Sequence, residues 1–352
     1  MLDLIRPRGP AAALAALAVV ALGAALALAP SAAHAQPSDD EIGDTQPFLA
    51  LFPTLRTRPA PSWIAPGVRV TYRSAAAAAA GGASGAGVIQ YDIAARDATQ
   101  VLAYETMYGD DGLGPYALAT GAVRGYPGLG LFWIDPGVLV GAESLAGPDL
   151  SITRYDKTLD DDTLVHVIRF QATGAGTTVW EFDSETGVLV FDSQTGNGGA
   201  NQTTLVDIRV LPLPWGSSRA PNWVRSGAEL DYSGSKATTI PAAGTVQQPI
   251  TIDIRVSAAG ARWSLLTLAS TLNGASQGTG PGLTGEGQLV GGLWLPRSAL
   301  ALNLGAPALV DTDPVTGAQV YFGKDQGSIV IQRLTAASRT TWLYDPTLGA
   351  LT

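Results

Sequence analysis

Residues 180–189 (WEFDSETGVL) return near the end of the chain as residues 342–351 (WLYDPTLGAL). The aromatic residues at the first and third positions of each copy share one face of a strand, because side chains alternate along a strand. The aspartate then opens a tight turn, and the glycine takes the positive φ angle that lets the next strand return. Each copy is therefore predicted to be a strand, a turn and the start of a returning strand.

Other motifs also recur in the same order, at offsets that grow from 160 to 162 residues along the chain. Six of the eight tryptophans fall into three matched pairs. The matched positions are Leu51, Leu55, Pro61, Trp63, Gly67 and Tyr72 with Leu211, Trp215, Pro221, Trp223, Gly227 and Tyr232; Asp92 and Ile93 with Asp253 and Ile254; and Gly130, Leu131 and Trp133 with Gly292, Leu293 and Trp294. This pattern indicates a tandem duplication.

Between the motifs, apolar residues recur at every second position, as in Val68, Val70 and Tyr72. The chain holds 42 glycines and 23 prolines, so turns are frequent and helices are disfavoured. We predict an all-β fold of two tandem repeats, each a strongly curved antiparallel sheet or a partly open β-barrel. The first β-domain spans residues 47–215 and the second spans residues 216–352.

The second repeat ends just after its copy of the motif and lacks the final strand of the first. We expect its sheet to be left open or to be completed by residues 47–55 or 205–211. Aspartate-to-glycine turns are also predicted at residues 192–196 and 313–317.

Three glycine-rich or alanine-rich stretches, residues 74–87, 110–128 and 276–291, are expected to be loops. The last two occupy equivalent points of the two repeats. They are either lids over a cavity or plain surface loops.

The N-terminus reads as a secretory signal peptide over residues 1–35, with basic residues, an apolar run at 11–29 and cleavage near Ala35. An uncleaved membrane anchor through residues 11–29 is the alternative. Residues 36–46 are acidic and are expected to be a disordered leader. The mature protein is thus expected outside the cytoplasm, in the periplasm, on the cell surface or secreted. With no cysteine, it depends on buried cores and has no disulfides.

Composition excludes several kinds of chemistry. The net charge of −9 argues against nucleic acid as a partner. Only His166 remains after His34 in the signal region, and its place in an alternating strand predicts a surface residue. The fingerprint-like glycines at 280–285 precede no amphipathic helix, so they do not predict a dinucleotide site.

The acidic pairs and runs are expected in loops, as solvated acids or casual calcium ligands that lack a full ligand series. They are Asp110 and Asp111; Asp160, Asp161 and Asp162; and Asp311 and Asp313. The paired tryptophans are expected either to fill the core or to line a cavity for an apolar or sugar-ring ligand. We predict no catalytic residue, no metal site and no cofactor.

At the level of architecture, the chain resembles the exported bacterial lipid-binding proteins with a curved sheet, the LolA/LppX-like family. The resemblance rests on export, on the repeat size and on the aromatic, Asp, turn and Gly order in residues 180–189 and 342–351. It implies carriage or sensing of a hydrophobic ligand.

We therefore expect an exported, non-enzymatic binding or carrier protein for a hydrophobic small molecule or lipid, with no stable membrane span after cleavage. Two alternatives stay open. One is a structural or adhesive cell-envelope protein without a ligand, and the other is a carboxylate-based hydrolase.

Overall fold

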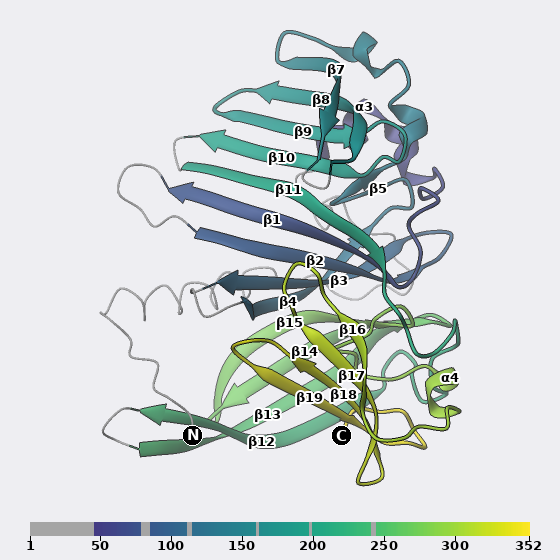
Figure 1. Ribbon diagram of the computed structural model, residues 1–352, viewed down its shortest axis with the longest axis vertical. Coiled ribbons are helices and arrows are strands. Elements are labelled where there is room, and N and C mark those ends of the chain that lie inside the picture. Colours follow the sequence, from purple (N-terminus) through teal and green to yellow (C-terminus); the bar gives the residue numbers. More distant parts are fainter. Residues whose placement is uncertain (1–45, 79–84, 111–114, 160–161, 197–198, 241–243) are drawn as a thin grey trace. The chain divides into compact units, whose positions relative to one another are not determined.

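The computed structural model describes residues 46–352, except residues 79–84, 111–114, 160–161, 197–198 and 241–243 (Figure 1). The predicted signal peptide and almost the whole predicted leader lie outside the described residues. The fold is all-β, as predicted. In the described part, the α-helices are α3 (Gln46–Leu51) and α4 (Arg297–Leu300), and both are short.

Nine antiparallel strands form the main sheet, and Figure 1 shows their order. From one edge to the other they are β4 (Pro115–Gly125), β3 (Val101–Asp110), β2 (Gly85–Arg96), β1 (Val68–Ala78), β11 (Gly199–Val210), β10 (Leu189–Gly196), β9 (Thr177–Asp183), β8 (Leu164–Thr173) and β7 (Leu150–Thr158). The pairing of β1 with β11 joins two hairpin series that are distant in sequence. Bulges interrupt the β1–β11, β2–β3, β3–β4 and β9–β10 ladders and bend the strands there.

Smaller sheets make up the rest of the described chain. One contains β12 (Glu229–Ile240), β13 (Gly244–Ala259), β14 (Trp263–Leu272) and β15 (Ala275–Gly285); another contains β16 (Ala308–Thr312), β17 (Gln319–Asp325), β18 (Ser328–Leu334) and β19 (Arg339–Tyr344); and β5 (Leu129–Gly130) pairs with β6 (Trp133–Ile134). Short 3-10 helices are η2 (Pro53–Arg56), η3 (Pro136–Val138) and η4 (Ala142–Leu145). None of these sheets closes on itself within the described residues.

The described chain divides into two compact units. The smaller unit consists of Val224–Ala259 and Ser264–Gly282, which is most of the β12–β15 sheet. The larger unit holds the described residues of His34–Trp223 together with Gly260–Trp263 and Leu283–Thr352. The predicted division into domains 47–215 and 216–352 stays a prediction.

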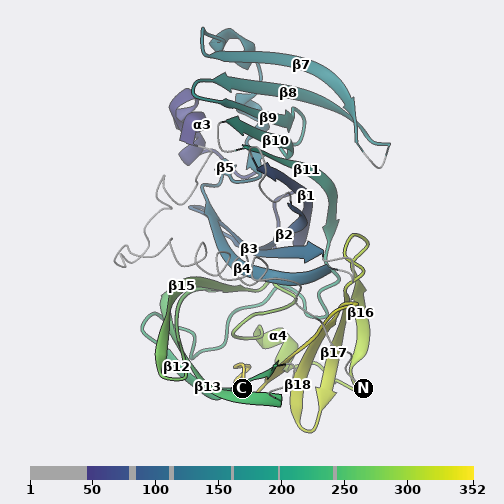
Figure 2. The same cartoon turned by 90° about the vertical axis from the view of Figure 1, so that its left-hand side faces the viewer.

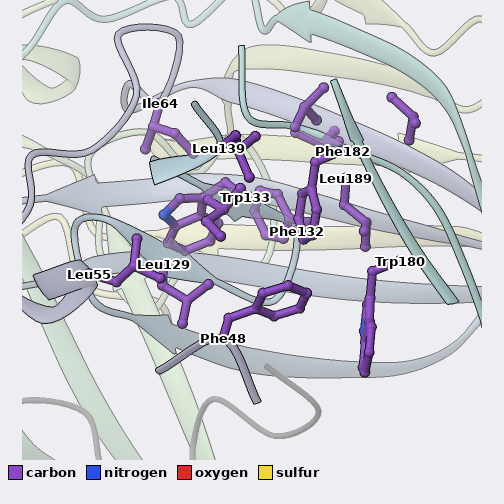
Figure 3. Close-up of a cluster of buried hydrophobic side chains, with 14 of the residues drawn as sticks. Phe48, Leu55, Ile64, Leu129, Phe132, Trp133, Leu139, Trp180, Phe182 and Leu189 are labelled. Carbon is purple, nitrogen blue, oxygen red and sulfur yellow. The ribbon is translucent and has the colours of Figure 1, made fainter. Parts of the chain in front are cut away.

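Two apolar cores lie in the larger unit. The first contains Val68, Val70 and Tyr72 of β1, with Phe48 and Trp133, and Figure 3 shows part of it. The second is built around Leu211, Trp215 and the β16–β19 sheet. Residues at every second position of β1 enter the first core, as the alternating pattern predicts.

Most described residues of the three expected loops are strands instead, and residues 79–84 and 111–114 lie outside the described residues. Residues 115–125 form β4, residues 275–285 form β15, and Ser74 to Ala78 continue β1. Glycine occurs at some positions of β4 and β15 because a side chain there would collide with a neighbouring residue. A Cβ on Gly282 would meet the Cδ1 of Leu268 at 2.4 Å, and one on Gly121 would meet the carboxylate of Glu105 at 3.1 Å. The prediction of loops, and with it the idea of two lids, was wrong.

One other expectation was wrong, and two alternatives for the second repeat are excluded. Residues 192–196 are the end of β10 rather than a turn, because their backbone pairs with both β9 and β11. Neither proposed closing strand completes a sheet of residues 216–352, which agrees with the alternative of an open sheet. Residues 46–51 and 53–56 are helical, and β11 pairs with β1 and β10.

The two copies of the opening motif make matching hydrogen bonds. Gly187 N–H donates to Asp183 O, and Gly349 N–H donates to Asp345 O, both at 2.8 Å. The indole N–H of Trp63 donates to Thr186 O, and that of Trp223 donates to Leu348 O, again at 2.8 Å in each case. These equivalent contacts agree with a duplication, which itself stays a prediction.

Candidate functional site

An apolar groove lies between helix α3 and the outer strands of the nine-stranded sheet. Its volume is about 250 Å³. Figures 1 and 2 show α3 beside β8 and β9. The lining consists of Pro47, Phe48, Ala50 and Leu51 from the α3 segment and of Leu150, Phe170, Ala172 and Trp180 from β7, β8 and β9. Every lining residue is apolar or aromatic.

Phe48 is the centre of the contact between α3 and the sheet. Its ring lies edge-on at 5.1 Å from Phe170 and Trp180 and at 5.3 Å from Phe182, measured between ring centroids. Figure 3 shows the Phe48 ring directed toward Trp180. Edge-to-face packing of this kind is favourable, and it fixes α3 against the sheet through apolar contacts.

The groove has the chemistry of a hydrophobic binding site. Its walls offer apolar surface and rings, without a charged side chain to orient a polar ligand. Its volume is just below the range of about 300–1,000 Å³ that is usual for small-molecule sites, so it suits a slender apolar group.

The smaller unit carries a second apolar surface, on one face of the β12–β15 sheet. Leu230 and Tyr232 of β12 pair with Ile254 and Ile252 of β13, which places their side chains on the same face. Leu230, Tyr232 and Ile252 are only partly buried, and none of the four residues belongs to either apolar core. Residues of the opposite face, such as Asp231, are exposed. This face presents apolar side chains on the two neighbouring strands β12 and β13.

The tryptophans divide between the two expected roles. Trp133 and Trp294 are fully buried, which agrees with the core role. Trp180 is buried in the first core and also lines the groove. Its counterpart Trp342 lies beside the guanidinium of Arg333 instead. One member of a matched pair can thus line a groove while the other does not.

His166 is exposed, as predicted. Its Nδ1 lies 2.7 Å from Asp156 Oδ1, and its Nε2 lies 3.8 Å from Glu185 Oε1. The hydrogen bond with Asp156 raises the pKa of His166. A shallow groove of about 340 Å³ lies here, lined by Arg154, Tyr155, Asp156, His166, Val167 and Ser184. In the absence of a shielded pocket, this arrangement is that of a surface ion pair.

Asp311 and Asp313 are buried, which corrects the expectation of solvated or calcium-binding loop acids. Arg209 pairs with both oxygens of Asp311, at 2.7 and 2.8 Å. Asp313 Oδ2 accepts from Arg69, Arg209 and Gln90 at 2.8 to 3.0 Å. Because arginines occupy these oxygens, they are not available to a metal. No group of three or more metal-ligating side chains occurs in the described part of the chain.

Asp313 also performs the predicted turn chemistry. Its Oδ1 accepts from the N–H groups of Val315 and Thr316 and from the Thr316 hydroxyl. Burial by itself would raise the pKa of Asp313, but the charge of Arg69 and the hydrogen bonds from Thr316 and Gln90 hold it well below its usual value. The carboxylate therefore stays ionised.

Arg69 forms a fork with Asp92, at 2.6 and 2.8 Å. Burial alone would lower the pKa of Arg69, but Asp92 and Asp313 outweigh it and raise that pKa. We call Arg69, Asp92, Arg209, Asp311 and Asp313 the ion cluster. It ties β1, β2 and β11 to the turn that follows β16.

The other acids of the expected loops are placed as follows. Asp110 is the last residue of β3, and Asp162 has a positive φ of 64°. Asp111, Asp160 and Asp161 lie outside the described residues. The glycines at 280 and 282 belong to β15, so the discarded dinucleotide fingerprint has no helix after it.

The sequence did not identify Phe48 as a site residue, because residues 47–55 were interpreted only as a possible closing strand of the second repeat. The signal was present in the run PFLALF, which follows an acidic stretch and precedes a proline. Six residues are too short a window to separate a helix from a strand by periodicity.

Comparison with known proteins gives little further information. No protein-family model and no curated protein sequence matches the chain. Among solved structures, MucB in complex with MucA(peri) is 10% identical with a TM-score of 0.26, and the match covers 81% of this chain and 88% of that one. MucB alone is likewise 10% identical with a TM-score of 0.26, covering 68% and 81%. TM-scores this low establish neither a shared fold nor a shared function.

Proposed function

We propose that the protein is an exported, non-enzymatic binding protein that carries a hydrophobic ligand. The apolar groove beneath α3 is the observation that carries this proposal, because all eight of its lining residues are apolar or aromatic. The partly buried apolar face of the β12–β15 sheet adds support. A lipid acyl chain or another slender apolar molecule is the ligand class that such surfaces accept.

The polar groups of the described chain favour binding over catalysis. The buried aspartates of the ion cluster are held by arginines, so they are not free to move a proton. The pair of His166 and Asp156 is solvent-exposed and has no shielded pocket beside it. A carboxylate-based hydrolase would need two free carboxylates facing a cleft.

Export is the second part of the proposal, and it rests on the sequence of residues 1–35. Within the described chain, no helix has the length and apolarity that crossing a bilayer requires.

A structural cell-envelope protein is the second candidate, and the ion cluster favours it. Buried ionic contacts and large aromatic cores make a rigid body whether or not a ligand is bound. The two functions differ in one observable, which is saturable binding of an apolar molecule.

The test is to purify the chain after export, extract it with organic solvent and analyse the extract by mass spectrometry. The stripped protein is then titrated with cis-parinaric acid, a fluorescent fatty acid. We expect a co-purified lipid and saturable binding, weakened by about tenfold or more in Ala172→Trp, where the indole fills the groove. The control is Ala146→Trp, which adds the same indole at an exposed alanine.

Wild-type protein that yields no lipid and binds no fatty acid would rule out the carrier and leave the structural candidate. If Ala172→Trp binds as well as Ala146→Trp, the ligand site lies elsewhere, and the β12–β15 face becomes the next place to test.

A further inference from the structure

Arg333 on β18 is a buried cation with no counter-ion among the residues that the structure describes. Its exposed fraction is 8%, and its Nε is buried with no hydrogen-bond partner. Its Nη1 donates to the Tyr108 hydroxyl at 3.1 Å. The guanidinium carbon lies 5.6 Å from the ring centroid of Tyr108 and 5.7 Å from that of Trp342.

Buried Arg69 and half-buried Arg209 are different. Arg69 pairs with Asp92 and Asp313, and Arg209 pairs with Asp311 and Asp313. These contacts use both oxygens of Asp92, both oxygens of Asp311 and Oδ2 of Asp313. In the described part of the chain, no carboxylate lies within ion-pair distance of Arg333.

This burial is unfavourable as it stands. A guanidinium is charged at every pH at which proteins fold, and a buried charge costs free energy unless it is paired. The two aromatic rings offset part of that cost through cation–π contacts. The two rings do not replace a hydrogen-bond acceptor for the N–H at Nε, because a buried N–H needs an acceptor that lies along the N–H bond.

We propose that Arg333 anchors an anion-binding site whose ligand is a carboxylate or phosphate group. Nε and the adjacent terminal nitrogen form the edge of the guanidinium that binds two oxygens at once. This site is separate from the apolar groove and does not depend on the proposed function. A free anion and a lipid headgroup both supply the required oxygens.

Two neighbours shape the site. Burial raises the pKa of Tyr108, so its hydroxyl stays protonated and keeps a hydrogen to donate beside Arg333. The Trp342 ring is partly exposed and lies 5.7 Å from the guanidinium carbon of Arg333. Trp342 therefore gives a fluorescent reporter next to the guanidinium.

The experiment titrates the full mature chain with sodium phosphate and, separately, with sodium acetate at constant ionic strength. Tryptophan fluorescence and the thermal unfolding midpoint are recorded. We expect both signals to saturate in the wild type and the apparent affinity to fall by about tenfold or more in Arg333→Gln. Arg339→Gln is the matched control, because Arg339 is an exposed arginine on the neighbouring strand β19.

An unsaturated wild-type signal, or an equal response in Arg333→Gln, overturns the proposal. Should Arg333→Gln fail to fold, Arg333→Lys replaces it. Lysine keeps the positive charge but cannot bind two oxygens at once as the planar guanidinium does, so we expect weaker anion binding. An unchanged affinity again overturns the proposal. Flotation with vesicles of phosphatidylglycerol, against phosphatidylcholine, distinguishes a lipid headgroup from a free anion as the source.

Discussion

The two faces of the nine-stranded sheet are covered in opposite ways. On one face, Val68 and Val70 of β1 enter an apolar core to which Phe48 of α3 also belongs. On the other, Arg69 of the same strand pairs with Asp92 and with Asp313, which is 244 residues further along the chain. Helix α3 packs on one face through the aromatic ring of Phe48. The turn at Asp313 binds the other face through charged side chains.

This difference teaches that an alternating strand need not have a solvent face. A polar residue at every second position usually faces water, but Arg69 and Thr71 are as buried as Val68 and Val70. The charges are tolerated because each has a partner. Apolar contacts adapt to a changed shape, whereas a buried charge that loses its partner cannot adapt.

The largest loss of stability is expected when the ion cluster on the charged face is disrupted. Asp313→Ala leaves the buried Arg69 and the half-buried Arg209 with one carboxylate fewer, so we expect a loss of about 3–5 kcal/mol in the free energy of unfolding. Urea denaturation measures it. Asp345→Ala is the control, because that aspartate accepts the same kind of turn hydrogen bonds but is only half-buried. Equal losses in the two variants would contradict the role given to the ion cluster.

A smaller effect is expected on the apolar face. Phe48→Ala removes a fully buried ring, but the short helix α3 can shift to close the space. We expect a loss of about 2–3 kcal/mol, below the loss of about 3–5 kcal/mol for a ring that cannot relax, such as in Phe182→Ala. Urea denaturation of both variants checks the order. If Phe48→Ala costs as much as Phe182→Ala, α3 is as rigid as the sheet.

The smallest effect is expected in how the free energy of unfolding changes at acidic pH. The pKa of Asp313 is lower in the folded than in the unfolded chain, so its contribution is complete above the unfolded value of about 3.9 and is lost as the pH falls through the folded pKa. We expect unfolding free energies to agree at pH 7 and pH 5 as far as this group is concerned, and to fall toward pH 2. Asp313→Asn should lack this component. An identical acid profile in wild type and variant would show that other carboxylates dominate.

Much of the fold could be predicted from local patterns. The alternation in β1, the turn at Asp183 and the all-β class follow from side-chain periodicity and from the chemistry of aspartate and glycine. The glycine-rich strands β4 and β15 could not be predicted in this way. Their glycines make room for neighbours such as Leu268, and that requirement is visible only once strands are paired.

The candidate site was harder to predict for the same reason. Trp180 could be identified as either a core or a groove residue, but its partner Phe48 comes from a helix more than a hundred residues earlier. Asp313 could be assigned to a turn, whereas its arginines lie on β1 and β11. Contacts between segments so far apart leave no periodic mark in the sequence.

The sequence separation within the ion cluster has a consequence for how the chain folds. Arg69 meets Asp313 only after 244 further residues are available, and the indole of Trp63 meets Thr186 after 123. Contacts of such long range slow folding, because large loops must close before any contact stabilises them. The ion cluster therefore forms only after more than a hundred residues beyond the last strand of the main sheet have been synthesised.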